Sequence, residues 1–266
     1  DQKFYDGKKN FKKMFFEAME QTVKNFDTFD KNYSYIFILQ HPENRIVVNF
    51  TEPNLVLLKM YKNDGTALKE ANFYERPFDD FRLYFDVPRK FNLTTFEEIE
   101  KSVKEQPWGF VGFMIYSKDG TRTKIMNPNY CNVKNLKGNH KIQYQYYHLR
   151  KMKKIKEYLT FYPEHDKLFS EYRDDVNRWT SKLYQYYVDL KILKRGSFGD
   201  IPYEFRPHVF NLHGRYLKKL FPIGRKINFN EVVDYVNALA PERIMFAINY
   251  KFKYPETISQ TTLTKV

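Results

Sequence analysis

The stretch FILQHPENRIV, at residues 37–47, decides the fold class of this chain. A turn of sequence Pro-Glu-Asn separates its two apolar runs, and a third run, EPNLVLL, follows at residues 52–58. Short apolar runs bounded by Pro, Asn and Asp are typical of β-strands. We therefore predict strands at 35–39, 46–50 and 55–61. Taken alone, the stretch also fits an ordinary hairpin joined by the Pro-Glu-Asn turn.

Two further stretches follow in a fixed order, WGFV at residues 108–111 and KIMNPNY at residues 124–130. Together with residues 37–47, they resemble motifs IIIa, IV and V of the phage-type RNA ligase 1 family of covalent nucleotidyltransferases. In that family the patterns are F-E-L-x-x-P-x-N-R-I-V, E-G-F-V and K-x-K-x-P-x-Y. The resemblance extends over residues 30–140. It implies a ligase-like nucleotidyltransferase domain with a helical module after it.

The charged residues of the three motifs are replaced in this chain. Ile38 and Trp108 stand where the family has glutamates, and Met126 stands where it has a second lysine. Ile38 cannot accept a hydrogen bond or bind a cation. The resemblance implies a vestigial nucleotide site that holds no metal, in which Phe37 stacks on a base. Its residues would be Phe37, Ile38, Arg45, Trp108, Gly109, Phe110, Lys124 and Met126.

Lys124 is the cation that remains in the third motif. Side chains alternate along a strand with a period of two, so Lys124 and Met126 are expected to share one face. A pair of lysines there would neutralise nucleotide phosphates, whereas Met126 offers an apolar contact without charge. An ordinary solvated strand residue is the alternative interpretation of Lys124.

The nucleophilic lysine of the family, in a K-x-D-G setting, is not found at its place. Covalent nucleotidyl transfer needs that amine to attack the α-phosphorus. The run KNDGT at residues 62–66 follows the first motif instead of preceding it, and it fits a hairpin turn. Lys118-Asp119-Gly120 fits a turn as well. We expect no catalytic residue in this chain, and a nucleophile only on an upstream segment or a separate chain.

Composition limits the class of protein. The chain has 266 residues, 42% of them hydrophobic, with 25 Phe and 22 Tyr, which excludes intrinsic disorder. No apolar run approaches the roughly 20 residues that span a bilayer. The chain starts at Asp1 without a signal-peptide pattern, so we expect an intracellular, non-secreted protein, with a virion as one setting. The one cysteine, Cys131, fits a reducing compartment.

The net charge of +13 indicates a polyanionic partner. Nucleic acid, RNA rather than DNA, is the first expectation and acidic protein surfaces are the second. A generally lysine-rich proteome is the alternative explanation.

The sequence predicts two domains, a partial ligase-like α+β domain with a mostly antiparallel sheet at 1–138 and an all-α domain at 139–266. In the first, apolar residues between Phe11 and Val23 recur at helical spacing. A capping box of Thr94 and Glu97 starts a helix at 94–104, and 110–116 with 122–126 form a hairpin. Residues 81–87 are a further candidate strand. In the second domain we predict helices at 142–161, 166–193, 205–221 and 231–239, the last opened by Asn228 and closed by Pro241, with a frayed polar tail at 255–266.

Basic residues cluster in the helical half. The candidate nucleic-acid-binding residues are Lys151, Lys153, Lys154, Lys156, Arg215, Lys218 and Lys219. Tyr144, Tyr146, Tyr147 and Tyr158 lie among the first cluster and could stack on bases. The alternative is a helix with tyrosines inward and lysines solvated. The six histidines, His208 and His213 included, show no metal-ligand spacing.

These observations favour a catalytically degenerate RNA-ligase-like protein, a nucleic-acid binder or a structural component of a larger, viral assembly. It would need no cofactor. The alternatives are an ATP- and Mg²⁺-dependent RNA ligase completed by an upstream chain, and a nucleotide sensor that uses Phe37 and Lys124. No membrane partner is expected.

Overall fold

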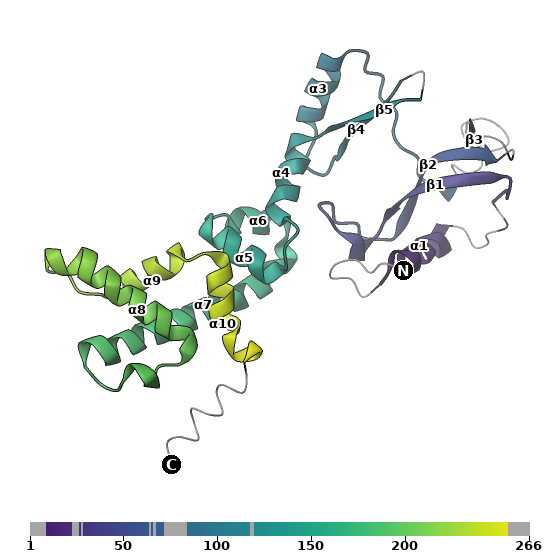
Figure 1. The fold of residues 1–266 in the computed structure, drawn as a ribbon. Coiled ribbons are helices and arrows are strands. Elements are labelled where there is room, and N and C mark those ends of the chain that lie inside the picture. Colours follow the sequence, from purple (N-terminus) through teal and green to yellow (C-terminus); the bar gives the residue numbers. More distant parts are fainter. Residues whose placement is uncertain are drawn as a thin grey trace. The chain divides into compact units, whose positions relative to one another are not determined.

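The structure is a computed structural model, and it describes residues 9–22, 27, 29–63, 65, 68–71, 84–117 and 120–254. The chain forms two compact units, residues 1–134 and 135–266 (Figure 1), and helix α4 (Pro128–Lys137) contains the division. The first unit combines helices with small antiparallel sheets. The described part of the second unit is helical. The predicted α+β class is therefore confirmed.

The first sheet has the strand order β1-β2-β3 and is antiparallel throughout. Strands β1 (Tyr33–Gln40) and β2 (Asn54–Asn63) confirm two of the predicted strands, and β3 (Leu68–Ala71) was not predicted. The strand predicted at 46–50 is wrong. Because β1 pairs directly with β2, residues 41–53, which include the short 3-10 helix η2 (Pro42–Asn44), form the connection between them.

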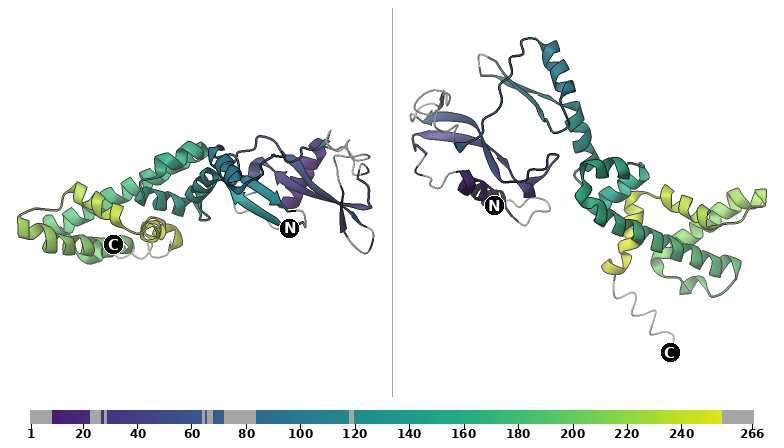
Figure 2. Two further views of the ribbon diagram at one scale, coloured as in Figure 1. Left: turned by 90° about the horizontal axis from the view of Figure 1, so that it is seen from above. Right: turned by 180° about the vertical axis from the view of Figure 1, so that it is seen from behind.

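Helix α1 (Phe11–Thr22) covers one face of this sheet (Figures 1 and 2). Its apolar stripe follows the helical spacing that the sequence predicted. The buried core residues are Met14, Ala18 and Met19 of the helix and Leu55, Leu57 and Met60 of β2. Each fully buried side chain of this size contributes roughly 1.5–3 kcal/mol, so the alternation along β2 fixes which face of the strand turns inward.

The second sheet is the predicted hairpin of β4 (Gly112–Tyr116) and β5 (Arg122–Met126). Before it, helix α3 (Phe96–Glu105) begins with a capping box formed by Thr95 and Glu98, not by Thr94 and Glu97. The predicted strand at 81–87 is wrong in its described part. Residues 81–83 lie outside the described residues, and Asp86 forms only an isolated bridge to Val56.

The helices of the second unit are α5 (Ile142–Lys151), α6 (Ile155–Phe161), α7 (Asp166–Tyr187), α8 (Arg206–Arg215), α9 (Phe229–Ala238) and α10 (Pro241–Lys253). All of them except α10 correspond to helices that the sequence predicted, with partly different ends. Short 3-10 helices are η3 (Pro163–His165), η5 (Phe198–Asp200), η6 (Tyr203–Phe205) and η8 (Phe221–Ile223), and π-helical turns are η4 (Val188–Ile192) and η7 (Tyr216–Leu220).

Three features of this unit depart from the prediction. The helix predicted at 142–161 is broken at Lys153, which has a positive φ of 58°. The two π-helical turns extend α7 and α8. Pro241 does not end a helix but occupies the first turn of α10, a helix that the sequence did not predict.

The predicted cap of α9 is confirmed, because Asn228 Oδ1 accepts from the Glu231 amide at 3.0 Å. The tail at 255–266 lies outside the described residues.

Candidate nucleic-acid interface

One face of the β4–β5 hairpin carries exposed cations beside exposed apolar side chains. The register pairs Met114 with Lys124 and Tyr116 with Arg122, and opposite residues of an antiparallel pair point to the same side. All four of these side chains are exposed. Half-buried Met126, opposite Gly112, completes the set. We call Met114, Tyr116, Arg122, Lys124 and Met126 the hairpin face. Lys124 and Met126 therefore share a face, as the period of two predicted.

The opposite face of the hairpin is the one that packs. Phe113 is buried, and its ring lies 4.9 Å from the ring of Phe91 and 5.1 Å from that of Phe110. Because these aromatic contacts occupy one face, the hairpin face is left to solvent. Arg122 and Lys124, two residues apart on one strand, are separated by roughly 7 Å along it. They are the charged residues among the described residues of the hairpin, 112–117 and 120–126.

A lysine from the first sheet contacts the hairpin face. The Lys59 Nζ atom lies 4.4 Å from the centroid of the Tyr116 ring and 2.6 Å from Glu70 Oε2. Burial opposes the charge on Lys59, but the Glu70 carboxylate outweighs it, so the pKa of Lys59 lies above its ordinary value. The ammonium therefore stays charged at neutral pH and holds the Tyr116 ring in place.

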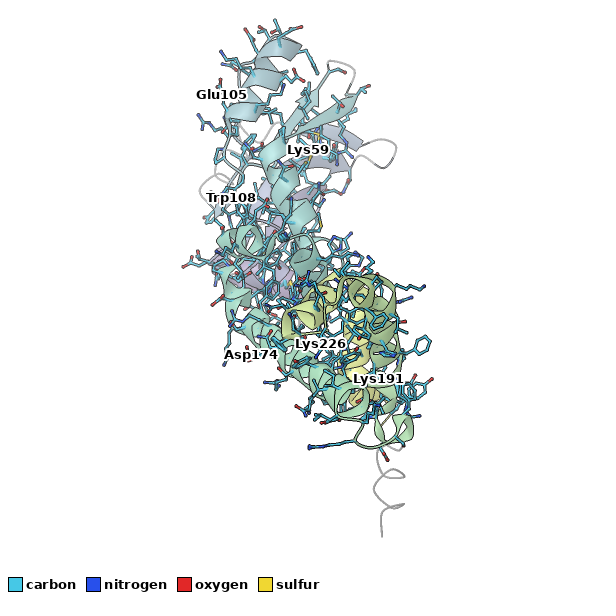
Figure 3. The ribbon with its side chains drawn as sticks, turned by 90° about the vertical axis from the view of Figure 1, so that its left-hand side faces the viewer. Lys59, Glu105, Trp108, Asp174, Lys191 and Lys226 are labelled. Carbon is cyan, nitrogen blue, oxygen red and sulfur yellow. The ribbon has the colours of Figure 1, made fainter. Side chains whose placement is uncertain are left out.

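Asn127 fixes the loop that carries the second motif. This asparagine is fully buried, and its Nδ2 donates to the carbonyl oxygens of Pro107 at 2.8 Å and Phe110 at 2.9 Å. Its Oδ1 accepts from the Asn129 amide at 2.9 Å, which caps α4. Trp108 lies in that loop, just after Glu105 and the end of α3 (Figure 3). The structure thus brings Trp108 to the Met126 end of the hairpin.

Gly112, not Gly109, is the glycine that the geometry requires. Gly112 has a φ of +149°, and a Cβ atom there would collide with the carbonyl oxygen of Ile125. A Cβ on Gly109 would meet no atom within 4 Å. Sequence reasoning singled out Gly109 because it belongs to the motif. It missed Gly112 and Asn127, although Asn127 lies inside the third motif.

The residues of the first motif do not share one surface. Phe37 is half-buried and packs against the core, where its ring lies 4.9 Å from that of Phe85 and 6.3 Å from that of Phe15. This packing gives no support to the prediction that Phe37 stacks on a base, because its face of β1 is the one that α1 covers. Ile38 lies on the other, exposed face. Arg45 donates through Nε to the Val47 carbonyl oxygen at 3.4 Å.

A buried histidine holds the turn after β1. His41 Nδ1 accepts from the Glu43 amide at 3.1 Å, and His41 Nε2 lies 3.0 Å from Glu17 Oε2. Lys9 pairs with both Glu17, at 2.8 Å, and Glu43, at 2.9 Å. The hydrogen bond from Lys9 lowers the pKa of Glu17. This network ties α1 to η2, and each of its groups already has a partner.

The tyrosines of the helical unit do not form a base-stacking surface. Tyr146, Tyr147 and Tyr158 are buried, and the hydroxyl of Tyr144 donates to Glu242 at 2.6 Å. That hydrogen bond lowers the pKa of Glu242, and Lys151 adds to the effect. The alternative interpretation, with tyrosines inward, is confirmed for Tyr146, Tyr147 and Tyr158, whereas Tyr144 is half-buried.

Two of the predicted nucleic-acid-binding cations of this unit lie beside carboxylates. Arg215 pairs with Glu231 at 3.2 Å, and Lys154 lies 3.6 Å from Glu157. The exposed ones are Lys151, Lys153, Lys156, Lys218 and Lys219. The first three surround the break between α5 and α6, where they can contact phosphates without an aromatic partner.

No known family model matches this chain, and no curated protein matches it. Among the residues that the structure describes, no group of three or more His, Cys, Asp or Glu gathers as metal ligands would. None of the helices in the described ranges is both long and apolar enough to cross a bilayer.

Proposed function

We propose that this chain is a catalytically degenerate, RNA-ligase-like protein that binds single-stranded RNA on its hairpin face. The observation that carries the proposal is the register of β4 with β5. It places Arg122 and Lys124 on one exposed face with Tyr116 and Met114. Cations that contact phosphates, next to apolar rings on which bases stack, are the usual elements of single-strand binding.

The overall charge supports a polyanionic ligand. The chain carries a net charge of +13, and the predicted partner of such a chain is nucleic acid. Lys59 is occupied by Glu70, so its role is to orient Tyr116 rather than to hold a phosphate. Lys151, Lys153 and Lys156 would add phosphate contacts that do not depend on sequence.

The residues at the motif positions argue against covalent catalysis by this chain. Ile38 and Trp108 have no carboxylate oxygen with which to ligate a metal ion or accept from a ribose hydroxyl, and Met126 cannot neutralise a phosphate. Each missing contact would remove several kcal/mol of transition-state stabilisation, by order of magnitude. Lys62 and Asn63 of the KNDGT run are the last residues of β2, in which Asn63 pairs with Leu68 of β3 in antiparallel register. Asp64 and Thr66 of the run lie outside the described residues, so the turn predicted there stays a prediction.

Binding to the hairpin face is tested with a fluorescent single-stranded RNA of about 12 nucleotides. The double variant Arg122→Ala/Lys124→Ala should weaken binding roughly ten-fold and reduce the slope of log affinity against log salt by about 1.4, since each phosphate contact on a single strand contributes about 0.7. The matched control is Lys12→Ala/Lys101→Ala, which removes the same charge from exposed positions on α1 and α3. Equal losses in the two double variants would overturn the proposal.

A second measurement addresses the ligase alternative. The chain is incubated with α-labelled ATP and magnesium and then denatured. We expect no label on the protein, because the nucleophile of the family is not at its place. A label that survives denaturation would overturn the degenerate interpretation and favour an ATP-dependent ligase.

In the binding assay, a DNA oligonucleotide of the same sequence and length as the fluorescent RNA should bind more weakly than the RNA.

A further inference from the structure

The outer side of α8 and the turns after it is an exposed apolar face. The side chains of Phe210, Leu217, Phe221 and Ile223 are 70%, 51%, 63% and 63% exposed. Scattered single apolar residues are normal on a protein surface, but a contiguous apolar patch marks a site of interaction. We call these four residues the α8 face.

The α8 face cannot turn inward, because the other side of the helix is already packed. Val209, Leu212 and Leu220 are buried. Two polar contacts join α8 to α9, which lies beside it (Figures 1 and 2). His208 Nδ1 lies 2.9 Å from the Tyr235 hydroxyl, and Arg215 pairs with Glu231 at 3.2 Å. The helix is therefore held in one orientation.

The shape of the α8 face fits an elongated partner. Phe210 and Phe221 are eleven positions apart along α8, η7 and η8, which corresponds to roughly 16 Å at helical rise. Gly214 stands between Phe210 and Leu217, and a Cβ atom there would meet nothing within 4 Å. This leaves an open notch between two large side chains. A side chain projecting from a partner helix would fill it, as knobs fill holes in helix packing.

The charges around the α8 face indicate which charge a partner should carry. From Arg206 to Asn230 the sequence has six cations and neither Asp nor Glu. Two of these cations, Arg215 and Arg225, pair with Glu231, which directly follows, and the other four keep the surroundings of the face positive. Lys218 and Lys219 are exposed. Arg225 and Lys226 come two and three residues after Ile223, the last residue of the face, and Lys226 is labelled in Figure 3. A second copy of this chain would bring the same positive charge, which repels. A partner with carboxylates beside its apolar residues would be attracted instead.

We infer that the α8 face binds an amphipathic helix of another protein, with apolar residues at i, i+3 or i+4, and i+7 and with acidic flanks. This inference is independent of RNA binding, which we place on the hairpin face of the other unit. Burial of Leu217 and Phe221 would supply the affinity, and Lys218 and Lys219 would supply the selectivity.

The test uses the whole chain and two designed helical peptides. Both carry leucines at the i, i+4, i+7 and i+11 positions, and one has glutamate at the remaining surface positions where the other has lysine. We expect the acidic peptide to bind and the basic peptide to bind at least roughly ten-fold more weakly. Leu217→Ser and Phe221→Ser should each weaken acidic-peptide binding roughly ten-fold. The control is Phe252→Ser, since Phe252 on α10 is 84% exposed and lies outside the face.

Three kinds of result would overturn the inference. The first is a lack of selectivity, which means equal binding of the acidic and basic peptides or equal effects of Leu217→Ser and Phe252→Ser. The second is binding to phosphatidylserine vesicles that Phe221→Ser abolishes, with no binding of the acidic peptide, which would assign the face to a lipid surface. The third is self-association in sedimentation that Leu217→Ser abolishes, which would assign it to a second copy. Circular dichroism of each variant verifies that the helices remain folded.

Discussion

The side-chain amide of Asn127 donates a hydrogen bond to the carbonyl oxygen of Pro107 at 2.8 Å. The same amide reaches the Phe110 carbonyl oxygen, so one buried side chain closes the loop that holds Trp108 and starts helix α4. The loop, the hairpin and helix α4 are thereby connected through Asn127. The position of the hairpin face depends on Asn127, because β5 ends at Met126, the residue before it.

We expect Asn127→Ala to lower the free energy of unfolding by about 3 kcal/mol. The substitution leaves buried carbonyl oxygens without donors and removes a helix cap. Urea denaturation measures the change. Asn129→Ala is the control, because Asn129 is exposed and its own hydrogen bonds are longer, at 3.1 and 3.4 Å. Equal destabilisation by the two variants would contradict the role assigned to Asn127.

Gly112→Ala should destabilise the hairpin, by roughly 3 kcal/mol, because the new Cβ atom collides with the Ile125 carbonyl oxygen and the backbone has a positive φ. Gly109→Ala should be nearly neutral, since the space around it is open. Thermal unfolding of both variants makes the comparison. If Gly109→Ala proves the more harmful change, the register of β4 with β5 is incorrect.

Met126→Lys should strengthen RNA binding several-fold and steepen the salt dependence by about 0.7, because it adds a cation to the hairpin face. The matched control is Thr123→Lys. Thr123 pairs with Ile115, so its side chain is on the opposite face, and it is exposed. Fluorescence anisotropy over a salt series measures both variants. An equal gain from Thr123→Lys would show that general charge, rather than the hairpin face, determines binding.

The stability of the helical unit should fall as the pH drops from about 6.5 to about 4. Burial lowers the pKa of His208 to about 4, and Arg243 adds to the effect. An unfolded histidine has a pKa near 6.5, so in this window the unfolded chain binds a proton that the folded chain does not. The contribution of His208 is complete above pH 6.5. By pH 4 about 3 kcal/mol is lost.

His208→Asn provides the comparison for this pH dependence, because an asparagine oxygen can still accept from the Tyr235 hydroxyl but does not titrate. Urea denaturation at several pH values should show a smaller decline between pH 6.5 and 4 in the variant than in the natural chain. Parallel declines in the two proteins would mean that other groups, not His208, cause the loss.

Local patterns predicted much of the first unit. The apolar spacing of α1, the alternation along β2 and the hairpin of β4 and β5 are all properties of short segments. The capping box was placed one residue early because Thr94 and Glu97 have the same spacing as Thr95 and Glu98. The strand at 46–50 was predicted from apolar residues alone, but a strand also needs a neighbour, and the pairing of β1 with β2 is a long-range property.

The errors in the helical unit have similar causes. A proline ends one helix or starts the next, and the sequence alone did not show that Pro241 starts α10. The left-handed Lys153 and the π-helical turns depend on packing. At the candidate site, alternation predicted that Lys124 and Met126 share a face. The inward side of Phe37 could not be predicted, because it depends on which face of β1 is covered by α1.

Photo-crosslinking of a single-stranded RNA that contains 4-thiouridine, followed by mass-spectrometric mapping, would locate bound RNA on the chain. We expect crosslinks within residues 112–126, with Tyr116 or Met114 among the modified residues and with loss of crosslinking in Arg122→Ala/Lys124→Ala. Crosslinks confined to the helical unit, around residues 150–156 or 215–219, would contradict this expectation.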